Sequence, residues 1–208
     1  MAGIGTAEDS YHGTPMRQQL RQRLKAERRK HEPAMRMAAA EAVAERLLAH
    51  LPADGGYLAG YWATGGELPL HVLQLRLPPQ WIWCLPVVQA NRQLLFAPWR
   101  AGDALGNNRY GIPEPLLTAD VCLAPEAMQA VIVPVVGFTR NGRRLGMGGG
   151  YYDTSFAFRK ARPAPPLLIG VAYACQEIEA LDAQDWDVPL DAVVTEQEWI
   201  DCRALGDG

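Results

Sequence analysis

One stretch of the chain suits the binding of a phosphate better than any other: residues 140–153, RNGRRLGMGGGYYD. Four glycines between positions 146 and 150 let the backbone come close to a bulky anion and present several N–H groups to it. Arg144, before these glycines, suits a phosphate clamp, and Asp153, after them, suits Mg2+, which proteins often hold with one or two carboxylates plus substrate phosphates. The stretch therefore predicts a phosphate site with a magnesium ligand at its end.

The same stretch has a purely structural interpretation. No GK[ST] follows its glycines, so it is not a P-loop, and the third glycine of G-x-G-x-x-G would fall on Tyr151. The Asn141-Gly142 pair is typical of a hairpin turn, which explains the first half without any ligand. A hairpin does not explain Arg144 or Asp153, so we favour the phosphate site.

A dense group of basic residues near the N-terminus is the second cationic feature. In a helix that turns about 100° per residue, Arg17, Arg21 and Arg28 lie within roughly 40° of one another, so one face is a cationic stripe. Leu20 and Leu24 sit beside the stripe, and we expect the helix to pack by one edge and offer its arginines at the other. A solvated basic helix without any ligand is the alternative.

These residues must be positioned by an alternating series of strands and helices. We predict helix at 15–50, broken near Pro33, at 68–77 and at 151–161; strands at 56–62, 80–88, 93–99, 130–138, 167–173 and 191–196; and a long irregular loop at 101–117. This alternation indicates an α/β fold with one layered sheet and helices on both faces, where ligands bind at the carboxyl ends of strands. The glycine stretch lies at such a place, between a buried strand and a helix whose N-terminal end favours anions.

Length and composition predict one domain at residues 16–208 after a flexible leader at 1–15. The 208 residues are 49% hydrophobic and 21% charged, which allows one sizeable core.

A net charge of -3 argues against general attraction to nucleic acid or to anionic membranes. No apolar run approaches the ~20 residues that span a bilayer, and the start does not resemble a secretion signal, so we expect a cytoplasmic protein. The widely spaced cysteines indicate neither a zinc site nor a redox pair.

The run PVVGFTRNGRRLGMGGGYYD resembles the signature of the 5-formyltetrahydrofolate cyclo-ligase family, also called methenyltetrahydrofolate synthetases: a strand, a turn, then R-L-G-x-G-x-G-[YF]-Y-D. Four further segments fit this family in the same order: RQQLRQRLKAERR, YWATGGELPL, YGIPEP and GVAYACQEIEALDAQDWDVPLDAVVTE. The resemblance thus spans nearly the whole chain after the leader. It implies an α/β fold related to sugar-phosphate isomerases and CoA transferases.

The resemblance also implies an ATP-dependent carbon–nitrogen ligase that converts 5-formyltetrahydrofolate and MgATP into 5,10-methenyltetrahydrofolate, ADP and phosphate. A formamide oxygen is a poor leaving group, and transfer of the ATP γ-phosphoryl to it turns it into phosphate, which leaves readily. The protein then has to supply positioning and charge stabilisation, without a covalent intermediate. We expect ATP and Mg2+ as cofactors, a folate with or without a polyglutamate tail as the small-molecule partner, and a monomer.

Roles for individual residues are carried over from the family pattern. The resemblance assigns ATP binding to Arg17, Arg21, Arg144, Leu145, Gly146, Met147, Gly148, Gly149, Gly150, Tyr151 and Tyr152. It assigns folate binding to Trp62, Glu67, Tyr110, Met147, Gly148, Gly149, Gly150 and Tyr151. Magnesium binding falls to Asp153 and Asp187, and the catalytic roles fall to Arg144, Glu67 and Tyr152.

Three of these residues also have an interpretation that involves no ligand. Glu67 precedes a predicted helix, whose dipole stabilises a carboxylate anyway. Asp187 lies beside a proline turn, and Tyr110 can simply pack under its loop. Many family members carry a lysine where this chain has Gly149, and its absence weakens charge neutralisation at the phosphoryl group unless neighbouring or N-terminal arginines replace it. Other members share the GMGGG form, so we interpret Gly149 as variation.

Two functions from other classes stay open at this point. A non-catalytic folate- or nucleotide-binding protein would keep the fold and buffer its ligand, although the intact Arg144, Asp153 and Glu67 argue against it. An RNA-associated protein would use the basic helix, and its binding would fall steeply with salt. ATP turnover that depends on 5-formyltetrahydrofolate would separate the enzyme from both.

Overall fold

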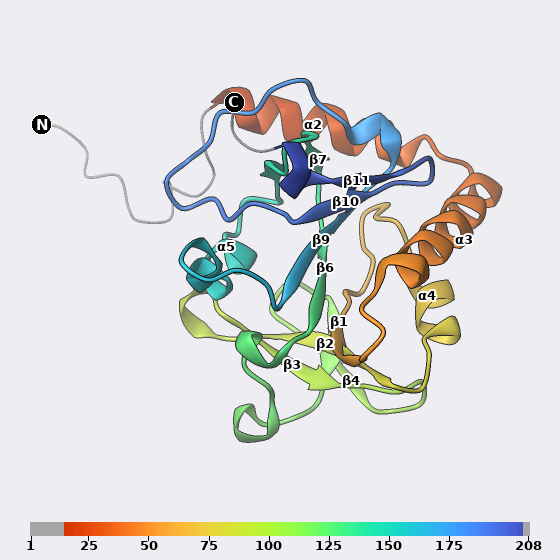
Figure 1. The fold of residues 1–208 in the computed structure, drawn as a ribbon, viewed down its shortest axis with the longest axis vertical. Coiled ribbons are helices and arrows are strands. Elements are labelled where there is room, and N and C mark those ends of the chain that lie inside the picture. The colour runs from red at the N-terminus through yellow and green to blue at the C-terminus, as the bar shows by residue number, and fades with distance from the viewer. Residues whose placement is uncertain (1–14, 206–208) are drawn as a thin grey trace, which may run out of the picture.

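A seven-stranded sheet runs through the computed structural model, which describes residues 15–205 (Figure 1). Its strand order is β11-β10-β9-β6-β1-β2-β3. The five inner strands are mutually parallel: β1 (Gly56–Ala59), β2 (Trp81–Val88), β6 (Ala130–Pro134), β9 (Leu167–Val171) and β10 (Ala192–Val194). The edges are antiparallel, with β3 (Leu94–Pro98) on β2 and β11 (Trp199–Asp201) on β10. Most of the predicted leader, residues 1–14, lies outside the described part of the chain.

Helices cover both faces of this sheet, as predicted. On one face α3 (Pro33–His50) and α4 (His71–Arg76) pack on the strands, and α3 buries Ala40, Val43, Ala44 and Leu47 at helical spacing. On the other face α5 (Tyr151–Ser155) and the 3₁₀ turn Ala157–Lys160 follow one another, with Phe156 buried between them. The run AVIVP of β6 is apolar throughout because both of its faces are covered. The predicted fold class is therefore confirmed.

The first helix, α2 (Pro15–Arg29), lies across one end of the sheet rather than on a face. Its Leu24 is buried against Val136 and Leu145, which follow β6. The predicted break between the first two helices is confirmed, because Pro33 stands in the first turn of α3, where a missing N–H costs nothing. In residues 15–205 no helix is long and apolar enough to cross a bilayer.

Four expectations about the elements were wrong. The predicted loop 101–117 contains a hairpin of β4 (Leu105–Asn107) and β5 (Pro113–Pro115), because the Asn108 side chain accepts backbone N–H bonds from Tyr110 and Ile112 and closes the turn. The helix predicted at 151–161 ends at Ser155, where the chain changes to a 3₁₀ turn and Phe156 enters the core. The strand predicted at 130–138 ends at Pro134, and Gly137–Phe138 belongs to a separate small sheet. The edge strand β11 was not predicted at all.

The remaining short elements lie in the connections. A second small hairpin pairs β7 (Gly137–Phe138) with β8 (Arg144–Leu145). Its turn at Asn141-Gly142, with Gly142 at φ +84°, confirms the hairpin predicted from that pair. Further 3₁₀ turns occur at Ala90–Arg92, Ala119–Val121, Pro125–Ala127, Ala174–Gln176 and Cys202–Leu205.

The strand order reverses beside β1, which pairs with β2 on one side and with β6 on the other. The chain leaves β1 toward β2 and returns later to β6, so the segments that follow β1 and β6 start from neighbouring strands. In open α/β sheets this reversal creates the crevice in which ligands bind. Residues 60–70 follow β1 and residues 135–150 follow β6, and these two segments contain most of the predicted site.

Candidate active site

The glycine loop, residues 146–150, directly follows β8 and ends at α5. Gly148 has φ +101° and Gly150 has φ +70°, so backbone geometry alone requires glycine at both. Gly146 differs, because a Cβ built on it would meet nothing within 4 Å. The fold therefore does not require glycine at 146, and the open space there is available to a ligand. The five-residue α5 adds only a short dipole to the loop.

Arg144 and Asp153, which flank the glycine loop, form an ion pair. Arg144 is 8% exposed, and its guanidinium also donates to the backbone oxygen of Val188. Asp153 Oδ1 in turn accepts the Val188 N–H at 3.1 Å. The two residues predicted as phosphate clamp and magnesium ligand are thus in direct contact, and both hold the segment that precedes β10.

Asp187, the other predicted magnesium ligand, is adjacent to the residue that Asp153 contacts. Its Oδ2 accepts a hydrogen bond from Arg17 Nη2 at 3.0 Å and from the Gln184 N–H at 3.0 Å. Asp153 and Asp187 therefore each use one carboxylate oxygen for the hydrogen bonds described. Residues 15–205 contain no group of three or more His, Cys, Asp and Glu side chains arranged to hold a metal. A metal ion at the pair would consequently need oxygens from a bound ligand, which is how Mg2+ accompanies nucleotide phosphates.

The arginine stripe of α2 faces inward and contacts three separate segments. Arg17 pairs with Asp187, Arg21 Nε donates to the Gly146 carbonyl at 2.8 Å, and Arg28 Nε donates to the Gly65 carbonyl at 3.2 Å. Arg28 is 1% exposed, so the solvated-helix alternative is wrong. We expected the helix to pack by an apolar edge and to offer its arginines at another edge, and this was also wrong. Leu24 is buried on the same face of α2 as Arg21 and Arg28, three residues after the first and four before the second.

Glu67 lies in the segment after β1, beneath the C-terminal end of α2. Its Oε1 is 3.8 Å from Arg28 Nη2, and its Oε2 accepts the Thr64 N–H at 2.9 Å. Burial raises the pKa of Glu67, against the lowering effects of the Thr64 hydrogen bonds and the Arg28 charge. Because α4 begins four residues later and Glu67 closes a turn with Thr64, the helix-dipole alternative does not describe it.

Aromatic side chains surround these loops. Tyr110, at the tip of the β4–β5 hairpin, is 57% exposed, and its hydroxyl lies 2.7 Å from that of Tyr151, to which Arg109 also donates. Tyr110 is therefore not packed under its loop. Trp62 is partly exposed and makes an edge contact with Trp99, ring centroids 6.0 Å apart. These two predicted folate residues lie on different segments, after β1 and on the hairpin.

Tyr152 lies in α5, and its pKa responds to the charge of Glu67. Burial raises the pKa of its hydroxyl, and the negative charge of Glu67 raises it further. Tyr61, which was not predicted, belongs to the same group: its hydroxyl donates to the Leu68 carbonyl at 2.7 Å, and burial and then Glu67 raise its pKa. No sequence signal marked Tyr61, whereas Arg28 was visible as a member of the arginine stripe.

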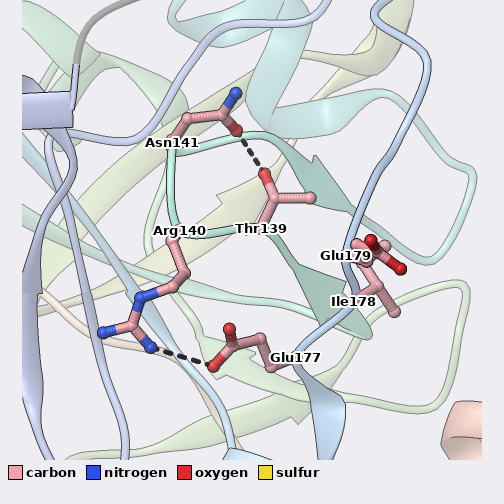
Figure 2. Close-up of a pocket in the computed structure, with 6 residues that line it drawn as sticks. All are labelled: Thr139, Arg140, Asn141, Glu177, Ile178 and Glu179. Carbon is pink, nitrogen blue, oxygen red and sulfur yellow. Dashed lines mark hydrogen bonds and ion pairs between the residues drawn. The ribbon is translucent and has the colours of Figure 1, made fainter.

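A surface hollow of about 340 Å³ lies elsewhere, around the β7–β8 turn (Figure 2). Its lining residues are Thr139, Arg140, Asn141, Glu177, Ile178 and Glu179. Arg140 is the single cation among these lining residues and stands with two glutamates, Glu177 and Glu179, so the lining carries a net negative charge. The hollow is therefore poorly suited to a phosphate, and the loops at the reversal of the sheet remain the candidate site.

The whole-chain comparisons agree on one family. The model of the 5-formyltetrahydrofolate cyclo-ligase family matches residues 13–196. The 5-formyltetrahydrofolate cyclo-ligase of Escherichia coli (strain K12) is 32% identical over 177 residues, which cover 83% of this chain and 96% of the relative. That of Haemophilus influenzae is 33% identical over 141 residues, covering 64% of this chain and 72% of the relative.

Solved structures show the same fold. The NMR structure of Aquifex aeolicus 5,10-methenyltetrahydrofolate synthetase has a TM-score of 0.74 and 29% identity, covering 93% of this chain and 94% of that one. The 5,10-methenyltetrahydrofolate synthetase of Mycoplasma pneumoniae, at 22% identity, has a TM-score of 0.65 over 86% of this chain and 98% of that one. With a family model covering most of its length and relatives matched nearly end to end, this chain belongs to the 5-formyltetrahydrofolate cyclo-ligase family.

Proposed function

We propose that this protein closes 5-formyltetrahydrofolate to 5,10-methenyltetrahydrofolate and converts ATP to ADP and phosphate in the same reaction. The observation that carries the proposal is that α2 contacts both the glycine loop, through Arg21, and the Glu67 segment, through Arg28. A phosphate-binding loop and a buried carboxylate are thereby joined at the reversal of one sheet. The relatives named above are cyclo-ligases, and this arrangement has the two parts that such a reaction needs.

The nucleotide side of the site comprises the glycine loop together with Arg17 and Arg21. The open space at Gly146 admits a phosphate, and the two arginines supply the positive charge that the loop lacks at Gly149. Asp153 and Asp187 fit the Mg2+ of MgATP, because each keeps a carboxylate oxygen beyond those used for the described contacts. Mg2+ held there would neutralise phosphate charge. Arg144 acts as a positioning residue, since its guanidinium fixes Asp153.

The folate side comprises Trp62, Glu67 and Tyr110, with residues 147–151 between the two ligands. In the reaction the formyl oxygen attacks the γ-phosphorus and ADP leaves. N10 then attacks the formyl carbon, loses its proton, and phosphate leaves with the former formyl oxygen. The protein holds the reactants in line and screens them from water, and Tyr152, whose pKa is raised by burial and by Glu67, is the tyrosine we assign to catalysis.

The test is an absorbance assay with purified protein, 5-formyltetrahydrofolate and MgATP, following the near-ultraviolet band of the methenyl product. We expect the band only with ATP, and we expect Glu67→Gln to lose most of the rate. Glu45→Gln, an exposed glutamate of α3, is the matched control and should behave as wild type. A folded wild-type protein that binds ATP and folate without forming the band would instead support the non-catalytic binding protein.

A further inference from the structure

Arg28 is the most deeply buried charged residue among residues 15–205, at 1% exposure. Two of its three guanidinium nitrogens have partners: Nε donates to the Gly65 carbonyl, and Nη2 lies 3.8 Å from Glu67 Oε1. Its Nη1 has no hydrogen-bond partner within the described part of the chain. Buried polar groups are nearly always paired, and a buried cation with an unused donor is costly.

A second buried polar atom without a partner belongs to Tyr173. The hydroxyl of Tyr173, a residue that is also 1% exposed, lacks a hydrogen-bond partner among residues 15–205. Its pKa is raised by burial and lowered by the charges of Arg36 and Arg28. Its ring lies 4.3 Å from that of His31, which follows α2. The unused donor of Arg28, next to Glu67, indicates that a polar ligand completes this part of the site.

The chemistry of that ligand follows from the two charged groups that lie side by side. Glu67 offers carboxylate oxygens, which accept hydrogen bonds, and Arg28 Nη1 offers a donor. The pyrimidine edge of a reduced pterin presents the complementary row, with an amino group and the N3–H as donors next to the 4-oxo oxygen as acceptor. We propose that Arg28 is a substrate-binding residue whose Nη1 donates to the 4-oxo oxygen of the pterin held against Glu67. This inference rests on the proposed function, because it requires a folate in the Glu67 segment.

A pair of ligands that differ at this edge of the pyrimidine ring tests the inference. Folic acid carries the 4-oxo group and N3–H, whereas 4-amino-4-deoxyfolate carries an unprotonated N3 and an amino group that cannot accept from Arg28. The change at N3 affects wild type and Arg28 variants alike, so comparing the two proteins isolates Arg28. The quantity to measure, by calorimetry, is the ratio of their dissociation constants, 4-amino over 4-oxo. We expect Arg28→Met to lower this ratio at least tenfold, since a lost charged hydrogen bond penalises only the 4-oxo ligand. Arg23→Met, an exposed arginine of the same helix, should leave the ratio unchanged.

A purely structural role gives a different result. If Arg28 only braces the Gly65 carbonyl, Arg28→Met weakens both ligands equally, the ratio stays constant, and the inference is overturned. Where Arg28→Met proves unfolded by circular dichroism, Arg28→Lys keeps the buried charge but loses the planar fork, and the same ratio should fall. If wild-type protein forms the methenyl product but the Arg28 variants keep the wild-type ratio of dissociation constants, only this inference is refuted. Wild-type protein that binds neither pteridine and forms no methenyl product refutes the proposed function and this inference together.

Discussion

Arg144 and Asp153 are joined by an ion pair in which the two side chains are 6% and 21% exposed. Both also contact the backbone of Val188, from its carbonyl and from its N–H respectively. The pair therefore connects β8, α5 and the segment before β10 through charged hydrogen bonds. Because the partners are largely withdrawn from water, removing one leaves the other uncompensated.

We expect Asp153→Asn to lower the free energy of unfolding by about 3 kcal/mol and to lose most turnover, since Arg144 then stays buried without its counter-charge. Asp201→Asn is the matched control, because its pair with Arg203 is exposed and such pairs contribute less than about 1 kcal/mol. Urea unfolding and the methenyl assay measure the two effects. An Asp153→Asn protein as stable and active as Asp201→Asn would contradict this account.

We expect glycine to be needed at position 146 for ligand binding and at position 148 for the backbone conformation. Gly146→Ala should unfold as wild type does, because its Cβ meets nothing within 4 Å, and yet raise the KM for ATP roughly tenfold by filling ligand space. Gly148→Ala should be destabilised by about 1–3 kcal/mol, because φ is +101° there. Thermal unfolding beside ATP titrations distinguishes the two, and an unchanged ATP KM in Gly146→Ala would remove position 146 from the nucleotide site.

Glu67 makes stability depend on pH in a defined direction. Burial raises its pKa in the folded protein above the ordinary value of 4.5, so the folded state binds the proton more tightly than the unfolded state. Its contribution to stability is fully present at pH below 4.5 and is lost as pH rises through the raised pKa. The unfolding free energy of wild type minus that of Glu67→Gln should accordingly fall across that window. A difference that grew with pH would show a lowered pKa instead.

At the scale of elements, the β4–β5 hairpin places Tyr110 against Tyr151, the first residue of α5 after the glycine loop. The two hydroxyls of Tyr110 and Tyr151 lie 2.7 Å apart, and their rings meet edge to face at 5.9 Å. Arg109 lies over both rings and donates to Tyr151. The hairpin therefore borders the space between the proposed nucleotide and folate sides.

Truncation of the hairpin tip should affect the folate more than the nucleotide. We expect Tyr110→Ala to raise the KM for 5-formyltetrahydrofolate several-fold, because an exposed aromatic ring that can stack on the ligand is lost, with ATP KM nearly constant. Tyr110→Phe keeps the ring, removes only the hydroxyl contact and should lie closer to wild type. Steady-state kinetics with each substrate varied measures this, and an effect confined to ATP would assign Tyr110 to the nucleotide.

Local sequence patterns predicted the helices and strands better than the contacts between distant segments. The continuous apolar run of β6 and the proline that starts α3 act within a few residues, so both were recognised. The β4–β5 hairpin was missed because its dense turn residues look like a loop until Asn108 is seen to close the turn. The contact between Arg28 and Glu67 depends on packing between segments 39 residues apart, which periodicity cannot give.

At the scale of the whole molecule, both edges of the sheet are short or occupied. The outer side of β3 exchanges two backbone hydrogen bonds with Leu123 through Phe96, at 2.9 and 2.7 Å. The other edge, β11, is three residues long and ends in the exposed Asp201–Arg203 pair. Such edges discourage pairing between copies. The single domain at 16–208 and the cytoplasmic location stay predictions.

We therefore expect a monomer of 22.8 kDa at micromolar concentration. Sedimentation equilibrium at several loading concentrations measures the mass directly. The mass should stay constant when 5-formyltetrahydrofolate and MgATP are added, because the proposed site lies within one chain. A mass that doubles with concentration, or on ligand addition, would refute the monomer.

The three inward arginines of α2 give the helix a role beyond holding loops together. Arg17 and Arg21 contact segments of the nucleotide side, and Arg28 contacts the folate side, so one rigid element is shared by both ligands. We expect whichever ligand binds first to hold this helix in place and so to lower the entropic cost for the second. Because such coupling is reciprocal, ATP should tighten folate binding by the same factor by which folate tightens ATP. Cooperativity between the two substrates is thus a consequence of one helix serving both sites.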